Sequence, residues 1–150
     1  MEKQFDVICM GRVAVDLYSQ QIGARLEDVS SFAKYLGGSS GNVAYGTARQ
    51  GLRSSMLARV GDEHMGRFLR EELNQVGCDT SHLITDKERL TALVLLGIKD
   101  RDTFPLIFIA ITARIWRLPP AMWTKVTLPP HGVLPSPGLT FLIPRPARRC

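Results

Sequence analysis

The sequence has few cysteines and no long apolar segment. Its three cysteines, Cys9, Cys78 and Cys150, are far apart and form no CxxC pair, so their spacing predicts neither a disulfide framework nor a metal site. The apolar run after the charged N-terminus, Phe5 to Met10, is too short for the hydrophobic part of a signal peptide or for a membrane span. These absences predict a soluble, cytoplasmic protein with reduced thiols and no bound metal.

Acidic residues are missing from the last part of the chain. All 14 acids lie in residues 1–108 with 13 of the 19 Lys and Arg residues, a net charge of −1, while residues 109–150 carry the other six and no acid, so −1 and +6 make the overall +5. A basic arm that binds nucleic acid or an anionic membrane would gather its charges on one face. Here the charges are scattered, so we expect neither a nucleic-acid nor a membrane partner.

Regular elements are predicted only in residues 1–108. Short β-branched apolar runs predict strands, and apolar residues at intervals of three and four predict a helix that follows Asp62 as its N-cap. The predicted strands are residues 5–10, 13–18, 31–36, 53–60, 90–97 and 103–108, and the predicted helices are residues 42–50 and 63–76. This order predicts an α/β fold, a parallel sheet with flanking helices.

Residues 109–150 show no such period. Eight of the nine prolines and both tryptophans lie there, and prolines interrupt both helices and sheet ladders. We therefore expect residues 109–150 to be disordered and to lie outside the domain that residues 1–108 form.

The segment from Gly37 to Asn42, Gly-Gly-Ser-Ser-Gly-Asn, connects a predicted strand to a predicted helix. Glycines let a ligand approach the main chain, and N–H groups at a helix N-terminus bind hydroxyl or anionic groups. The same composition also suits a flexible connection. The segment is not a Walker A loop, since no Lys-Ser/Thr ends it, and it lacks GxGxxG spacing.

Asp16 is a carboxylate inside the otherwise apolar run Val13 to Tyr18. A buried carboxylate needs hydrogen-bond partners, and sugar hydroxyls are suitable ones. Alternatively, the strand lies at a sheet edge and Asp16 faces water. His64 and His82 have no partner at ligand spacing, so both are predicted to be surface residues.

Together these motifs resemble the N-terminal pattern of PfkB (ribokinase-type) carbohydrate kinases. The resemblance rests on Asp16 in Gly-x-x-x-x-Asp, Gly37-Gly38 with Asn42, Arg59-Val-Gly-Asp62, Gly66, and Val76-Gly-Cys-Asp79 before Leu83. It covers residues 1–108 and implies a ribokinase-like fold with a small β lid and substrate contacts by Asp16, Gly37, Gly38 and Asn42. Within the family, Gly-Gly-Ser-Ser-Gly-Asn-Val-Ala is similar to the branch that phosphorylates a keto-deoxy sugar acid in inositol catabolism.

The resemblance also implies ATP and Mg²⁺ as cofactors and a homodimer formed through the lid strands. The family's catalytic Asp lies in a Gly-Ala-Gly-Asp loop at a helix N-terminus, with most of the ATP pocket nearby. This sequence contains neither, so it offers no catalytic residue. We expect these 150 residues alone to be an inactive kinase fragment with at most weak sugar binding.

A lost base near Phe108 would explain the unusual composition of residues 109–150. Codons compatible with Ile109 to Arg117, read one base out of frame, can encode Tyr-Arg-Asp-Asn-Cys-Ala-Asp-Met-Ala, which resembles the family's continuation. Codons for Ser136 to Leu142 can likewise encode Thr-Gly-Thr-His-Phe-Ser. Two matches in one frame indicate that residues 109–150 are an out-of-frame segment.

Overall fold

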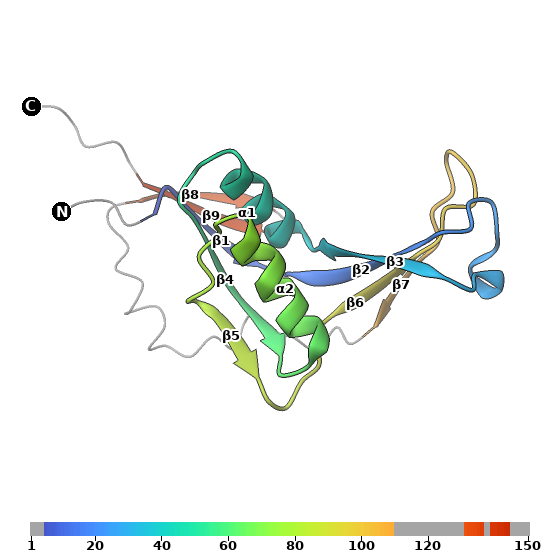
Figure 1. The fold of residues 1–150 in the computed structure, drawn as a ribbon. Coiled ribbons are helices and arrows are strands. Elements are labelled where there is room, and N and C mark those ends of the chain that lie inside the picture. Colours follow the sequence, from blue (N-terminus) through green and yellow to red (C-terminus); the bar gives the residue numbers. More distant parts are fainter. Residues whose placement is uncertain (1–4, 110–130, 137–138, 145–150) are drawn as a thin grey trace, which may run out of the picture.

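The apolar runs around Cys9, Met56 and Leu83 pair into a central sheet. The computed structural model describes residues 5–109, 131–136 and 139–144, and within them the sheet has the order β5-β4-β1-β9-β8 (Figure 1). Its strands are β1 (Val7–Gly11), β4 (Ser54–Gly61), β5 (Leu83–Asp86), β8 (His131–Ser136) and β9 (Leu139–Pro144). Strands β1, β4 and β5 run parallel, as strands joined by helical crossovers do. The predicted parallel sheet is confirmed.

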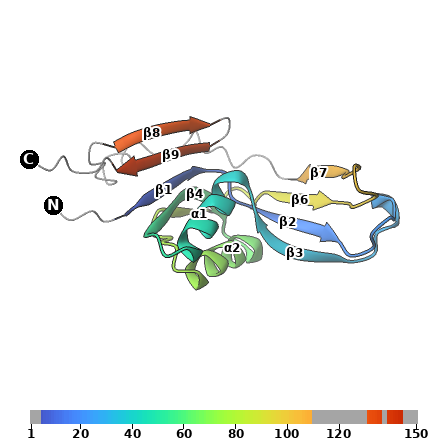
Figure 2. The same cartoon turned by 90° about the horizontal axis from the view of Figure 1, so that it is seen from above.

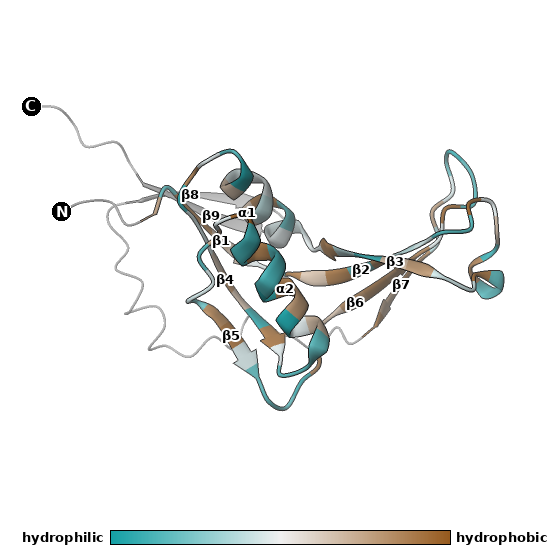
Figure 3. Ribbon diagram, viewed as in Figure 1, coloured by the Kyte–Doolittle hydropathy of each residue, from teal (hydrophilic) through white to brown (hydrophobic). Residues whose placement is uncertain are grey.

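Two helices, α1 (Ser39–Arg49) and α2 (His64–Gln75), cover one face of this sheet (Figures 1 and 2). The apolar residues of α2 recur every three or four positions, and its Leu69 and Leu73 are fully buried in a core that includes Met56 of β4. Figure 3 shows hydrophilic residues on the outward sides of both helices and hydrophobic residues along β4. The α/β fold class therefore follows from one amphipathic helix pair packed on an apolar sheet face.

A second sheet, called the lid sheet below, projects from the central sheet (Figure 2). Its order is β3-β2-β6-β7. The strands are β2 (Ala14–Ser19), β3 (Phe32–Gly37), β6 (Leu93–Leu96) and β7 (Leu106–Ile109), and a 3-10 turn, Leu26–Asp28, lies in the connection from β2 to β3. Strand β1 leads into β2, and β3 leads into α1. The lid sheet and the central sheet therefore meet where these two connections pass each other.

The ends of both helices differ from the prediction. Helix α1 begins at Ser39 rather than at Asn42, because Gly38, with a φ of 85°, is its N-cap. Helix α2 is capped by Glu63 rather than by Asp62, since the Glu63 carboxylate accepts the N–H groups of Met65 and Gly66. A glutamate side chain is longer than the usual capping residues, which is why the motif favoured its neighbour.

Strand β5 has no counterpart in the sequence-based prediction. Its four residues show no clear period, and its position depends on contacts with residues elsewhere in the chain. It pairs with β4, and Arg70 of α2 donates hydrogen bonds to the carbonyl groups of Thr80 (3.0 Å) and Leu83 (2.6 Å). Contacts with residues far away in the chain thus determine where this strand forms.

The structure also differs from the expected absence of regular elements after residue 108. Ile109 is the last residue of β7, and β8 and β9 form a hairpin whose second strand pairs antiparallel with β1. The free edge of β1 offers backbone partners that residue patterns do not reveal. The remaining residues expected to be disordered lie outside the described part, and the division at residue 108 stays a prediction. No helix within the described residues is long and apolar enough to cross a membrane.

Candidate functional site

The candidate site lies where the lid sheet joins the central sheet. The connection from β1 to β2 crosses the N-terminus of α1, and two hydrogen bonds hold them together. The Gly41 N–H donates to the Arg12 carbonyl oxygen (3.2 Å), and the Ser40 hydroxyl donates to the Met10 carbonyl oxygen (3.1 Å). The glycine- and serine-rich segment is therefore an ordered part of the helix N-terminus rather than a flexible connection.

Gly38 is required at this crossing for two reasons. Its φ of 85° lies in the region that L side chains rarely adopt. A Cβ atom at this position would also lie 2.5 Å from the Arg12 carbonyl oxygen and 2.9 Å from the Val13 Cα atom. The glycine thus lets the chain turn into α1 while touching the connection from β1 to β2.

Asp16 lies on β2 with its carboxylate against Gly37. A Cβ atom at Gly37 would overlap the Asp16 carboxyl group, so the glycine makes room for that group. Strand β2 lies between β3 and β6, which excludes the alternative that Asp16 sits on an edge strand. Burial raises the pKa of Asp16, and the nearby charge of Arg12 opposes this rise. Within the described residues the half-buried carboxylate accepts no hydrogen bond.

Aromatic and apolar residues surround Asp16 on its face of the lid sheet. Asp16 pairs with Tyr35 of β3 and with Val94 of β6, and Val94 pairs with Phe108 of β7. Directly opposed residues of paired strands point to the same side of a sheet. The Tyr35 ring also contacts the Tyr18 ring edge-on, with centroids 5.5 Å apart. The carboxylate thus lies in a face made mostly of aromatic and apolar side chains.

Asn42 lies in the first turns of α1, four positions after its cap. Its backbone N–H donates to the Gly38 carbonyl oxygen (2.9 Å), so only its exposed side-chain amide is free to bind a ligand. The structure therefore places the Asp16 carboxylate against Gly37, next to Gly38, and it places Asn42 near the N-terminal end of α1. No hydrogen bond joins the Asn42 and Asp16 side chains in the described part of the chain.

Arg12 belongs to this site, although the motifs did not single it out. Its guanidinium group lies over the Phe108 ring, 5.4 Å from the ring centroid, and its charge acts on Asp16. A lone arginine after a strand usually indicates a solvent-exposed turn, so the sequence carries no signal beyond its position between Gly11 and the buried Val13.

The motif Arg59-Val-Gly-Asp62 has a mainly structural role in this fold. Arg59 and Arg89 each donate to Oδ2 of Asp86 (3.2 Å), a carboxylate that is 8% exposed. The hydrogen bond from the Glu88 N–H, together with both guanidinium groups, lowers the pKa of Asp86 against the effect of burial. These contacts tie the ends of β4 and β5 together.

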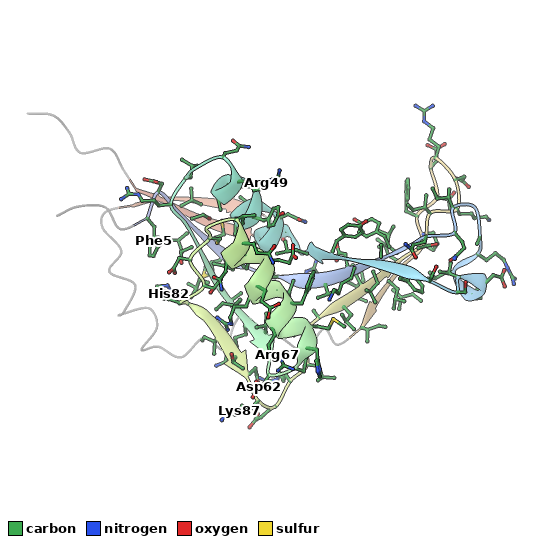
Figure 4. The ribbon with its side chains drawn as sticks, in the orientation of Figure 1. Phe5, Arg49, Asp62, Arg67, His82 and Lys87 are labelled. Carbon is green, nitrogen blue, oxygen red and sulfur yellow. The ribbon has the colours of Figure 1, made fainter. Side chains whose placement is uncertain are left out.

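The two histidines differ in their surroundings. His64 is exposed, as predicted. His82 is half-buried and meets the Phe5 ring nearly at right angles, with centroids 6.3 Å apart (Figure 4). Its Nδ1 atom lies 3.0 Å from the Ser81 hydroxyl. No group of three or more His, Cys, Asp or Glu side chains in the described residues is placed to hold a metal ion.

Residues 4–109 match the family model described as pfkB family carbohydrate kinase. This chain belongs to the pfkB family of carbohydrate kinases. The chain is 42% identical over 99 residues to a 5-dehydro-2-deoxygluconokinase from Geobacillus thermodenitrificans, and the match covers 65% of this chain and 29% of that protein. It is 34% identical over 87 residues to the protein of the same name from Bacillus subtilis, covering 58% of this chain and 27% of that protein.

The fold of this pfkB kinase chain matches solved sugar kinases. A sugar kinase from Pyrococcus horikoshii in complex with ATP superimposes with a TM-score of 0.65 at 32% identity, over 69% of this chain and 34% of that one. The ribokinase-like fold and ATP as a ligand of the family are therefore established. The chain spans about a third or less of the length of these relatives.

Proposed function

We propose that this chain supplies the sugar-binding part of a kinase that transfers the γ-phosphoryl group of ATP to a hydroxyl of 5-dehydro-2-deoxygluconate, a step of inositol catabolism. The names of the relatives at 34–42% identity support this substrate. The observation that carries the proposal is the Asp16 carboxylate, which lies half-buried over Gly37 without a hydrogen bond from the described residues. Such an acceptor needs donors, and sugar hydroxyls provide them.

Each candidate residue has a defined part in this proposal. Asp16 accepts hydrogen bonds from sugar hydroxyls, and the Asn42 amide both donates and accepts. Gly37 and Gly38 have no side chains, so the Asp16 carboxylate and the connection from β1 to β2 can lie close to the start of α1, where we place the sugar. In the reaction the hydroxyl oxygen forms a bond to the γ-phosphorus, the bond to the ADP oxygen breaks, and the hydroxyl proton passes to a base. We assign that base to the family's Asp outside these residues.

We include ATP and Mg²⁺ in the proposal as cofactors. Both would be bound by parts of the family fold other than these residues. The described residues provide no cluster of carboxylates for a metal ion, and ATP would supply only the phosphoryl group. We further propose a cytoplasmic kinase, which the free thiols of Cys9 and Cys78 suit, and a domain formed by residues 1–108, which the extent of the family match supports.

A second candidate function concerns these 150 residues by themselves rather than the complete kinase of the family. Residues 1–150 alone would be a non-catalytic fragment with at most weak sugar binding, since the 99 residues that match a relative cover 29% of that protein. We expect the purified 150-residue chain to show no ATP-dependent phosphorylation of 5-dehydro-2-deoxygluconate in a coupled ADP-release assay. Turnover above an enzyme-free blank would contradict this expectation.

The proposed sugar site is tested by direct binding of 5-dehydro-2-deoxygluconate to the chain, followed by nuclear magnetic resonance. Asp16→Ala and Asn42→Ala should each weaken binding by about 1–3 kcal/mol, because each leaves sugar hydroxyls unpaired. Matched controls are Glu71→Ala and Gln75→Ala, which remove an exposed carboxylate and an exposed amide from α2. Equal affinity in the Asp16 variant and its control would exclude Asp16 from the site.

A further inference from the structure

Arg12 occupies a fixed position at the centre of the candidate site. It follows β1 directly, and its carbonyl oxygen accepts the Gly41 N–H and lies against Gly38. Its backbone is therefore held at the N-terminus of α1. The side chain, which is exposed, starts from this fixed point and reaches the Phe108 ring of β7. A cation is thus placed between the helix N-terminus and the lid sheet.

The guanidinium group of Arg12 has unused hydrogen-bonding capacity. Five of the other eight arginines in the described residues donate to carboxylates or carbonyl oxygens within the fold: Arg25, Arg53, Arg59, Arg70 and Arg89. In the described part of the chain, the guanidinium nitrogen atoms of Arg12 make no hydrogen bond or ion pair, and the group lies over the Phe108 ring. The guanidinium donors of Arg12 are therefore available to a partner outside these residues.

The geometry points to a carboxylate as that partner. We propose that Arg12 binds the carboxylate of the sugar acid and so selects sugar acids over neutral sugars, an inference that rests on the function proposed above. A guanidinium group matches a carboxylate through two parallel hydrogen bonds, and stacking on an aromatic ring orients its plane. Asp16, whose charge is opposite, accepts hydrogen bonds from the sugar hydroxyls. Arg12 thus binds the carboxylate of the sugar acid, and Asp16 binds its hydroxyl groups.

The position of Asp16 also determines how Arg12 acts. The charges of Arg12 and Asp16 interact, but no hydrogen bond joins the two side chains within the described residues. The donors of Arg12 are thus not occupied by Asp16 and remain available to an anionic ligand. A neutral sugar has no carboxylate and would therefore gain neither the charge attraction nor the paired hydrogen bonds of the guanidinium group.

The test compares two ligands across matched variants of the 150-residue chain. Dissociation constants are measured by nuclear magnetic resonance for 5-dehydro-2-deoxygluconate and for fructose, a neutral keto sugar. Arg12→Gln should raise the dissociation constant of the sugar acid about tenfold and leave that of fructose unchanged. Arg12→Lys should lie between, since it keeps the charge without the paired donors. The control is Arg49→Gln (Figure 4), which also removes an exposed arginine from over an aromatic ring, that of Tyr45 at 5.9 Å.

The outcomes separate this inference from the proposed function. If Asp16→Ala weakens the sugar acid but Arg12→Gln does not, the sugar site stands and the role of Arg12 is overturned. If the wild-type chain binds neither ligand, both are overturned. Inorganic phosphate is the third ligand, because a guanidinium group also binds phosphate. Phosphate that binds the wild-type chain as tightly as the sugar acid, with loss in Arg12→Gln, would show a phosphate site and overturn carboxylate selection.

Discussion

At the residue scale, the carboxylate of Asp16 opposes folding at neutral pH. Burial raises its pKa in the folded chain above the ordinary value of 3.8. A group whose pKa is higher in the folded state stabilises the fold below its unfolded pKa and loses this contribution as pH rises through the folded pKa. At neutral pH the charged group is therefore held at a cost, as is common for groups that bind a ligand.

Asp16→Asn should therefore be at least as stable as the wild type at pH 7 and should bind the sugar acid more weakly. The amide carries no charge to desolvate, and it replaces one of the two acceptor oxygens with a donor. Urea unfolding at pH 7 and pH 4 tests this, because the stability gain should shrink at the lower pH. A variant less stable than the wild type at pH 7 would mean that Asp16 is an internal structural group.

At the scale of elements, Glu63 joins the N-terminus of helix α2 to Thr91, in the segment just before β6. Its Oε2 atom accepts the Met65 N–H (2.6 Å), and its Oε1 atom accepts the Gly66 N–H (3.2 Å) and the Thr91 N–H (3.1 Å). Oε1 also accepts the Thr91 hydroxyl. Burial alone would raise the pKa of Glu63, but these hydrogen bonds outweigh it and lower the pKa below its ordinary value of 4.5.

Glu63→Ala should lower the free energy of unfolding by about 1–2 kcal/mol, because the helix loses its cap. The pH dependence has a definite sign: a lowered folded pKa gives stability that is present above the unfolded value and is lost as pH falls through the folded one. The difference between the wild type and Glu63→Gln should thus shrink below about pH 4.5. Glu71→Gln, an exposed glutamate of the same helix, is the control and should show no such change in urea unfolding.

At the scale of the whole molecule, the lid sheet leaves apolar residues exposed at one edge. Strand β7 ends the sheet order, and its four residues, Leu106 to Ile109, are each 43–50% exposed. Apolar edge strands tend to pair with another chain. This edge is consistent with the proposed homodimer through the lid strands and with association of the isolated chain.

We expect the chain to self-associate in a concentration-dependent way and Ile107→Lys to reduce this association. A lysine on an edge strand opposes pairing because its charge would have to be desolvated. Leu52→Lys is the control, since Leu52 is similarly exposed, at 42%, but lies between α1 and β4. Light scattering over a range of concentrations measures the effect. The same loss of association in both variants would assign it to general hydrophobicity.

Local patterns in the sequence were sufficient for the fold class and for the family. The alternation of apolar strands with helix α2 arises from periods that span only a few residues, and packing against the sheet preserves them. The sequence alone was also sufficient to choose the candidate site residues Asp16, Gly37, Gly38 and Asn42, because the spacing of these residues along the chain is what identifies the motif.

Only the tertiary structure decided how these residues meet. That Asp16 lies on an interior strand, that Gly37 makes room for its carboxylate, and that the Arg12 side chain reaches Phe108 all depend on strand order and register. The same holds for Glu63, which binds a threonine from a distant loop. Contacts between residues far apart in the chain have no local period, so the amino-acid pattern alone does not contain them.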